Sequence, residues 1–146
     1  MESVVERFLR YVTFDTQSDE ESDTCPSTEK QKALAAALVE EMRGMGIADA
    51  RMDENGYVYG TVPGDLELPI IGLIAHMDTA PDASGANIKA KVVAYDGGDV
   101  CLNEEKGIFL READYSYLKN HVGKHLIVTD GTTPVSYTHL TLPTNS

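Results

Sequence analysis

The sequence predicts an α/β domain, on two observations. Residues 28–45 carry apolar side chains at helical spacing, and residues 69–76 form a continuous apolar run of strand length. A run of that kind, bounded by turn residues, is typical of a strand buried on both faces of a sheet that helices cover. Helical stretches mixed with short apolar strands favour the α/β class, and 146 residues suit one domain of ordinary size.

Two amphipathic helices are expected in the first third of the chain. The first covers Val4 to Val12, where apolar residues recur at helical spacing. The second covers Thr28 to Met45, and Thr28 with Gln31 fits a capping box at its start. Gly46 is placed to end this helix. The predicted buried stripe of the second helix consists of Leu34, Leu38, Met42 and Met45.

Short strands are expected after Gly46. Residues 48–52 and 57–62 predict a hairpin, because Asn55-Gly56 between them favours a two-residue loop. Further along the chain, the pattern predicts strands at 69–76, 89–95, 100–102 and 125–129 and a helix at 115–122.

Composition and charge exclude several classes of function. The 24 acidic residues outnumber the 12 Lys and Arg, and a net charge of −12 argues against nucleic acid or an anionic membrane as partner. Two cysteines are too few for a disulfide scaffold. The acidic start lacks the pattern of a signal peptide, and no apolar run reaches the roughly 18 residues that span a bilayer. The expected location is therefore the cytoplasm.

The candidate site is His76-Met77-Asp78, directly after the apolar run. Ligands of open α/β sheets bind beyond the carboxyl ends of strands. Side chains two residues apart in an extended segment point to the same side, so Asp78 could orient His76 as a zinc ligand. The alternative is an ordinary pair of loop hydrogen bonds, because zinc needs three or four protein ligands.

Several segments together resemble the tripeptide aminopeptidases of the M20 group of zinc metallopeptidases. The resemblance covers residues 1 to about 133. It includes the His76-Met77-Asp78 box with its Thr-Ala-Pro-Asp extension. The segments that carry the resemblance are 6–12, 15–18, 26–29, the helix end at 45–46, 71–82, 95–99 and 126–133.

The resemblance implies a mixed-sheet catalytic domain with helices on the sheet faces and a smaller domain inserted into it. It implies two zinc ions, with His76 as a zinc ligand and Asp78 as the catalytic-site carboxylate that orients it. In the family, a glutamate acts as general base on a metal-bound water, which attacks the first peptide bond of a tripeptide. The resemblance leaves open whether the intact enzyme is a homodimer.

The sequence departs from this family after Thr133, where the family continues into a Leu-Leu-Gly-Ala-Asp-Asp-Lys stretch with a bridging aspartate. Residues 1–133 are therefore expected to be the truncated N-terminal portion of the catalytic domain. Residues 134–146 resemble the in-frame translation of a transposase-type sequencing adapter and are expected to be a non-native tail. Resequencing the source DNA across the codons for Thr133 and Pro134 tests this expectation.

The remaining candidates for chemistry are expected to be ordinary surface residues. Glu104-Glu105 lies in a turn-like stretch, and His121, His125 and His139 have no metal-binding pattern. With one ligand and no identifiable base, the chain itself is expected to be inactive. The alternatives are another M20-type dipeptidase or deacylase, and a small non-catalytic module that binds a metal or a partner.

Overall fold

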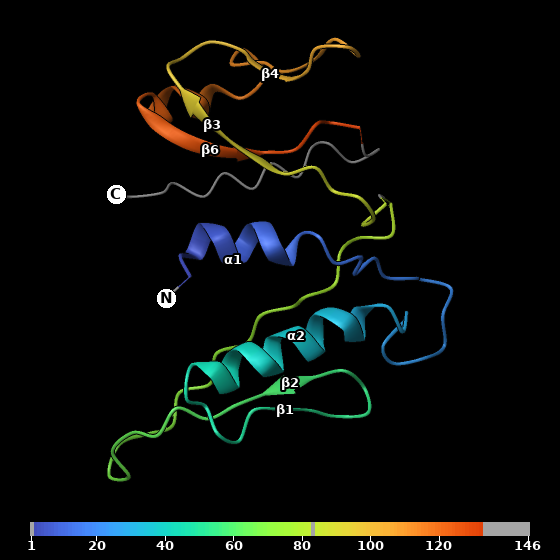
Figure 1. Ribbon diagram of the computed structural model, residues 1–146, viewed down its shortest axis with the longest axis vertical. Helices are drawn as coiled ribbons and strands as arrows, with labels where there is room; N and C mark the ends of the chain where they lie inside the picture. The colour runs from blue at the N-terminus through green and yellow to red at the C-terminus, as the bar shows by residue number, and fades with distance from the viewer. Residues whose placement is uncertain (1, 83, 133–146) are drawn as a thin grey trace. The chain divides into compact units, whose positions relative to one another are not determined.

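A computed structural model describes residues 2–82 and 84–132 (Figure 1). These residues form two compact units. The 14–81 unit is the continuous stretch Phe14–Pro81, and the flanking unit consists of the described residues on either side of that stretch. Helices and short strands occur together, which confirms the α/β class. The predicted tail at 134–146, including His139, and the predicted boundary at residue 133 lie outside the described residues.

Helix α1 (Val4–Tyr11) lies in the flanking unit and matches the prediction closely. Its start is fixed by a capping box that the sequence analysis did not identify. The Glu6 N–H donates to the Ser3 hydroxyl at 3.2 Å, and the Ser3 N–H donates to the Glu6 carboxylate at 2.7 Å. Two donors that the helix leaves without partners are thereby satisfied.

Helix α2 (Gln31–Gly44) begins three residues later than predicted. The predicted capping box at Thr28 is wrong, because the Thr28 hydroxyl donates to the Gln17 carbonyl at 2.7 Å and accepts from the Gln31 side-chain amide, not from a backbone N–H of the helix. The predicted stripe is correct only in part, since Met45 is 46% exposed. The buried residues of α2 are Gln31, Leu34, Ala35 and Val39.

The end of α2 confirms the predicted role of Gly46. Gly46 has a φ of 91°, which lies in the left-handed region that L side chains rarely adopt. Its N–H donates to the Arg43 carbonyl at 2.9 Å, and the Ile47 N–H donates to the Met42 carbonyl at 3.0 Å. This pair of bonds is a Schellman motif, and it satisfies two carbonyls of the last helical turn.

The predicted hairpin forms and packs against α2 (Figure 1). Strands β1 (Arg51–Met52) and β2 (Val58–Tyr59) pair antiparallel and are shorter than expected. Gly60 permits close packing, because a Cβ there would overlap with the Met42 side chain and lie 2.8 Å from Ile47 Cγ2.

The hairpin loop differs from the predicted two-residue loop. The Asp53 N–H donates to the Tyr57 carbonyl at 3.0 Å, so three residues, 54–56, lie between the closing pair. Gly56 has a φ of 85°, whereas Asn55 is not among the residues with positive φ. A two-residue type I′ turn needs positive φ at both central positions. The Asp53 carboxylate, which accepts from the N–H groups of Asn55 and Tyr57, supports the longer loop.

The flanking unit contains two antiparallel strand pairs. β3 (Lys91–Tyr95) pairs with β6 (Lys124–Val128), and β4 (Val100–Asn103) pairs with β5 (Ile108–Leu110). Three of these strands confirm the prediction with small shifts of their bounds, and β5 was not predicted. The segment predicted as a helix at 115–122 forms a 3₁₀-helix, η1 (Ser116–His121).

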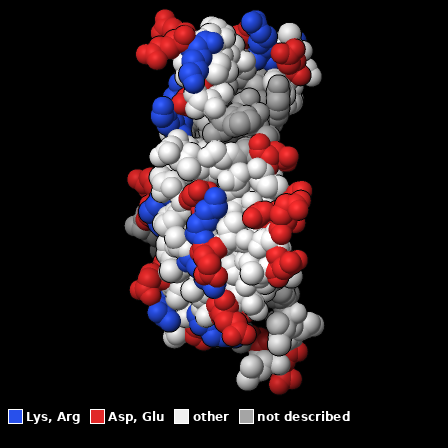
Figure 2. Space-filling model, turned by 90° about the vertical axis from the view of Figure 1, so that its right-hand side faces the viewer, with Lys and Arg blue, Asp and Glu red and all other residues white. Residues whose placement is uncertain are grey.

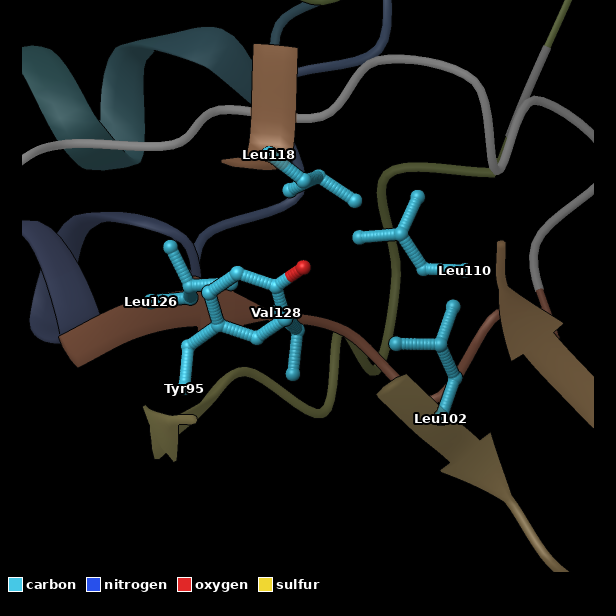
Figure 3. Close-up of a cluster of buried hydrophobic side chains, with 6 residues drawn as sticks. All are labelled: Tyr95, Leu102, Leu110, Leu118, Leu126 and Val128. Carbon is cyan, nitrogen blue, oxygen red and sulfur yellow. The ribbon is translucent and has the colours of Figure 1, made fainter. Parts of the chain in front are cut away.

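The core of the flanking unit lies where these strands meet η1 (Figure 3). Leu118 from η1 and Leu126 from β6 are fully buried, and Tyr95 packs in the same cluster. Truncating a buried leucine of this kind to alanine costs about 2–5 kcal/mol. The six residues of the cluster are Tyr95, Leu102, Leu110, Leu118, Leu126 and Val128.

The predicted strand at 69–76 is wrong. These residues have no regular secondary structure, and Ile70 and Ile74 are 100% exposed. A strand needs a partner for its backbone groups, and the described part of the chain pairs none with this segment. The expected mixed sheet is likewise not formed by the described residues, whose strands make three separate two-stranded antiparallel sheets.

Candidate functional site

The structure brings the side chains of His76 and Asp78 together. His76 Nδ1 lies 3.2 Å from the Asp78 carboxylate and 3.0 Å from the Asp78 carbonyl oxygen. Both of these oxygens are acceptors, so in the neutral imidazole Nδ1 carries the hydrogen and Nε2 keeps its lone pair. The His76 side chain is 86% exposed. An imidazole whose tautomer is set in this way is suited to bind a metal through Nε2.

The segment that follows His76 and Asp78 is held by the loop at 16–18. The Thr79 N–H donates to the Thr16 carbonyl at 3.0 Å, and the Ser18 N–H and hydroxyl both donate to the Thr79 carbonyl at 2.9 Å. Gln17 Nε2 donates to the Pro81 carbonyl at 2.8 Å. Gln17 and Thr79 form a parallel bridge. We call these contacts between residues 16–18 and 79–81 the clamp.

The clamp is connected to the start of α2. The Thr28 hydroxyl donates to the Gln17 carbonyl at 2.7 Å. Lys30 Nζ lies 3.0 Å from the Asp15 carboxylate and 3.3 Å from Gln17 Oε1. Burial raises the pKa of Asp15, but the hydrogen bonds from Lys30 and from the Gln17 N–H outweigh it, so the pKa lies below its usual value. Asp15 is therefore ionised at neutral pH and pairs with Lys30.

The described residues bring together one candidate metal ligand, His76, and one carboxylate that could orient it, which is less than a zinc site requires. Nowhere in residues 2–82 and 84–132 do three or more His, Cys, Asp or Glu side chains gather in a way that could hold a metal ion. Glu104 and Glu105 lie in an exposed turn, as predicted. The donor chemistry at His76 fits zinc, but further ligands are needed.

The surface charge agrees with the acidic composition. Acidic side chains are spread over the face shown in Figure 2, with Lys and Arg side chains among them. None of the helices in the described part of the chain is long and apolar enough to cross a membrane.

Sequence reasoning missed the clamp. Residues 15–18 carry no chemical motif, and only the resemblance singles them out. The clamp contacts are largely made by backbone groups, and Gln17 is 64 residues from its partner Pro81. The one available signal was that segments 15–18 and 71–82 both contributed to the same resemblance.

The chain is similar to proteins named Peptidase T. It is 54% identical over 138 residues to that of Alkaliphilus oremlandii, 56% over 136 residues to that of Desulfitobacterium hafniense strain Y51, and 50% over 135 residues to that of Geobacillus thermodenitrificans. These matches cover 91%, 91% and 90% of this chain. No family model matches the chain.

These matches confirm, over nine tenths of the chain, a resemblance to peptidases named Peptidase T. The chain spans about a third of the length of these curated relatives, at 34%, 33% and 33%. The similarity therefore applies to a part of such a protein.

Proposed function

Because the chain is homologous to proteins named Peptidase T over nine tenths of its length, we propose that it is a fragment of a zinc-dependent tripeptide aminopeptidase. The observation that carries the proposal is the contact of His76 with Asp78 inside a sequence about half identical to those relatives. The relatives' name also favours this reading over a dipeptidase or a deacylase. A cytoplasmic location and a dimeric whole enzyme remain predictions.

Two residues of this chain are proposed to act in the site. His76 Nε2 binds one zinc ion of a dinuclear centre, and Asp78 accepts the Nδ1 hydrogen and fixes the direction of the lone pair. When bound, zinc supplies an acidified water and polarises the peptide carbonyl. The other ligands and the general base come from parts of the whole enzyme that the described residues do not supply.

The proposal is tested with a chimera in which residues 1–133 replace the matching third of the Alkaliphilus oremlandii Peptidase T. The chimera is expected to release the N-terminal residue of tripeptides. His76→Ala should abolish this activity, because the site loses a ligand, and Asp78→Asn should lower it by roughly 10- to 100-fold. The measurement is kcat/KM with a tripeptide, a dipeptide and an N-acyl amino acid as substrates.

His125→Ala is the matched control, because His125 is exposed on β6 and lies in the flanking unit. It should leave turnover unchanged. Full activity of the His76→Ala chimera would contradict the role of His76. A preference for the dipeptide or the N-acyl amino acid would replace the tripeptide assignment with the corresponding alternative.

The isolated chain, assayed beside the chimera, is expected to show no zinc-dependent turnover of tripeptides. One histidine and one orienting carboxylate give a site short of ligands. Robust turnover by the pure chain would contradict this expectation.

A further inference from the structure

Among the described residues, the segment around His76 and Asp78 is held by nearby hydrogen bonds to another segment only on its C-terminal side. The backbone of residues 69–76 makes no hydrogen bond to another segment within the described part of the chain, and most of these residues are exposed. The nearest anchor is the clamp, which begins at Thr79, directly after Asp78. The positions of the two site residues therefore depend on how firmly the clamp holds residues 79–81.

Among the clamp contacts, the one made by Gln17 lies farthest along the chain from Asp78, because it reaches Pro81. Its side-chain amide donates to the Pro81 carbonyl at 2.8 Å and accepts from Lys30 Nζ at 3.3 Å. Its backbone N–H donates to Asp15 at 3.2 Å, and its backbone carbonyl accepts from the Thr28 hydroxyl. Every polar group of Gln17 thus has a partner, and these partners join residue 81 to the start of α2.

We propose that Gln17 is a positioning residue, whose side-chain amide holds residues 79–81 and thereby keeps the Asp78 carboxylate on His76 Nδ1. The importance of this role for catalysis rests on the proposed function; the contact itself does not. The amide NH₂ is the essential group, because the Pro81 carbonyl can only accept.

The side chains of Thr16 and Ser18 are less suited than that of Gln17 to hold residues 79–81. The Ser18 hydroxyl donates to the same Thr79 carbonyl that the Ser18 N–H already reaches, so its loss leaves that acceptor satisfied. Thr16 contributes its backbone carbonyl, which a side-chain substitution does not remove. Gln17 alone among these three extends the clamp to residue 81 through a side chain.

The test compares three variants of the full chain. Gln17→Ala removes both side-chain contacts, and Gln17→Glu keeps the acceptor for Lys30 but removes the donor for Pro81. Gln31→Ala is the matched control. It removes an amide that donates to the Ser27 and Thr28 hydroxyls, in the same network but without contact to residues 79–81. Gln31 is also more deeply buried, so its loss costs more overall stability.

Two measurements read the position of the site without enzyme activity. The first is the exchange rate of the Thr79 amide hydrogen. The second is the tautomer of His76 above pH 8, from ¹⁵N shifts of the histidine-labelled chain. The chain has four histidines, and the His76 signals are assigned with His76→Asn. An Nδ1–H majority reports the contact with Asp78.

Both Gln17 variants are expected to speed Thr79 exchange about fivefold, which corresponds to one lost hydrogen bond. Both should also lower the Nδ1–H population of His76, whereas Gln31→Ala should leave that population unchanged. Wild-type behaviour of Gln17→Glu, or an equal change in Gln31→Ala, would overturn the proposal. An inactive chimera would refute the proposed function but would leave these two measurements as a valid test of Gln17.

Discussion

At the scale of single residues, the Glu112 carboxylate links the end of β3 to the turn that follows it in the flanking unit. It accepts from the Gly98 N–H at 2.9 Å and from the Tyr95 hydroxyl at 2.8 Å. The Gly98 bond, followed by the Tyr95 bond, holds the pKa of Glu112 below its usual value. Burial, together with the bond to Glu112, raises the pKa of Tyr95. The charged carboxylate and the neutral phenol therefore stabilise each other.

This pair predicts an acid-sensitive contribution to stability. A carboxylate whose pKa is lowered on folding stabilises the native state above its unfolded pKa, and this stabilisation is lost as the pH falls through its folded pKa. The free energy of unfolding should therefore fall between about pH 6 and pH 3, and Glu112→Gln should flatten that dependence. Urea unfolding across this range is the measurement.

The matched control for this prediction is Glu105→Gln, which removes a carboxylate from the exposed 104–107 turn. This variant should keep the pH dependence of the original chain. An equal flattening in both variants would show that overall charge, and not the contact of Glu112 with Gly98 and Tyr95, causes the acid sensitivity.

At the scale of elements, the two glycines at the end of α2 should respond to alanine with opposite signs. A Cβ at Gly44 or at Gly46 meets no atom within 4 Å, so steric contact does not decide the outcome. Gly44 is helical, and Gly44→Ala should stabilise by roughly 0.5–1 kcal/mol. Gly46 has a φ of 91°, and Gly46→Ala should destabilise by about 1–2 kcal/mol.

Thermal unfolding followed by the helical circular dichroism signal measures both changes. Each variant serves as the control for the other, because both add the same methyl group to exposed positions two residues apart. The same sign for both would contradict the assignment of Gly46 as the left-handed cap.

The sequence predicted those elements whose determinants are local. The spacing of apolar residues and Gly46 were sufficient to locate α2, and Asn55-Gly56 was sufficient to locate the hairpin. The pattern failed for 69–76, because an apolar run indicates that burial is needed and not that a partner is present. Strand β5 was missed because three residues, 108–110, are too few for a period.

The same distinction applies to the candidate site. His76 and Asp78 could be predicted as a pair because they are two residues apart in an extended segment. The contacts of Gln17 could not, because they reach Pro81 across 64 residues and use backbone acceptors.

At the scale of the whole molecule, the exposed apolar segment at 62–74 should be the main cause of self-association in solution. Its exposed apolar residues are Val62, Leu66, Leu68, Ile70, Ile71, Leu73 and Ile74. Contiguous exposed apolar side chains on an unpaired backbone favour association with other chains. The isolated chain is therefore expected to self-associate, and Ile71→Lys should reduce this, as measured by light scattering at several concentrations.

The control for this prediction is Val122→Lys, because Val122 is also exposed but lies outside the segment. It adds the same charge and should leave the scattering nearly unchanged. If both variants reduced association equally, the change in net charge would explain the effect instead of the apolar segment.

The clamp also has a consequence for the order in which the 14–81 unit folds. The Gln17–Pro81 hydrogen bond closes a loop of 63 intervening residues, whereas the Asp53–Tyr57 bond of the hairpin closes over three. The entropy of closing the longer loop costs about 3 kcal/mol more. We therefore expect α2 and the hairpin to form before the clamp does. His76 and Asp78 would then reach their final positions last during folding and lose them first during unfolding.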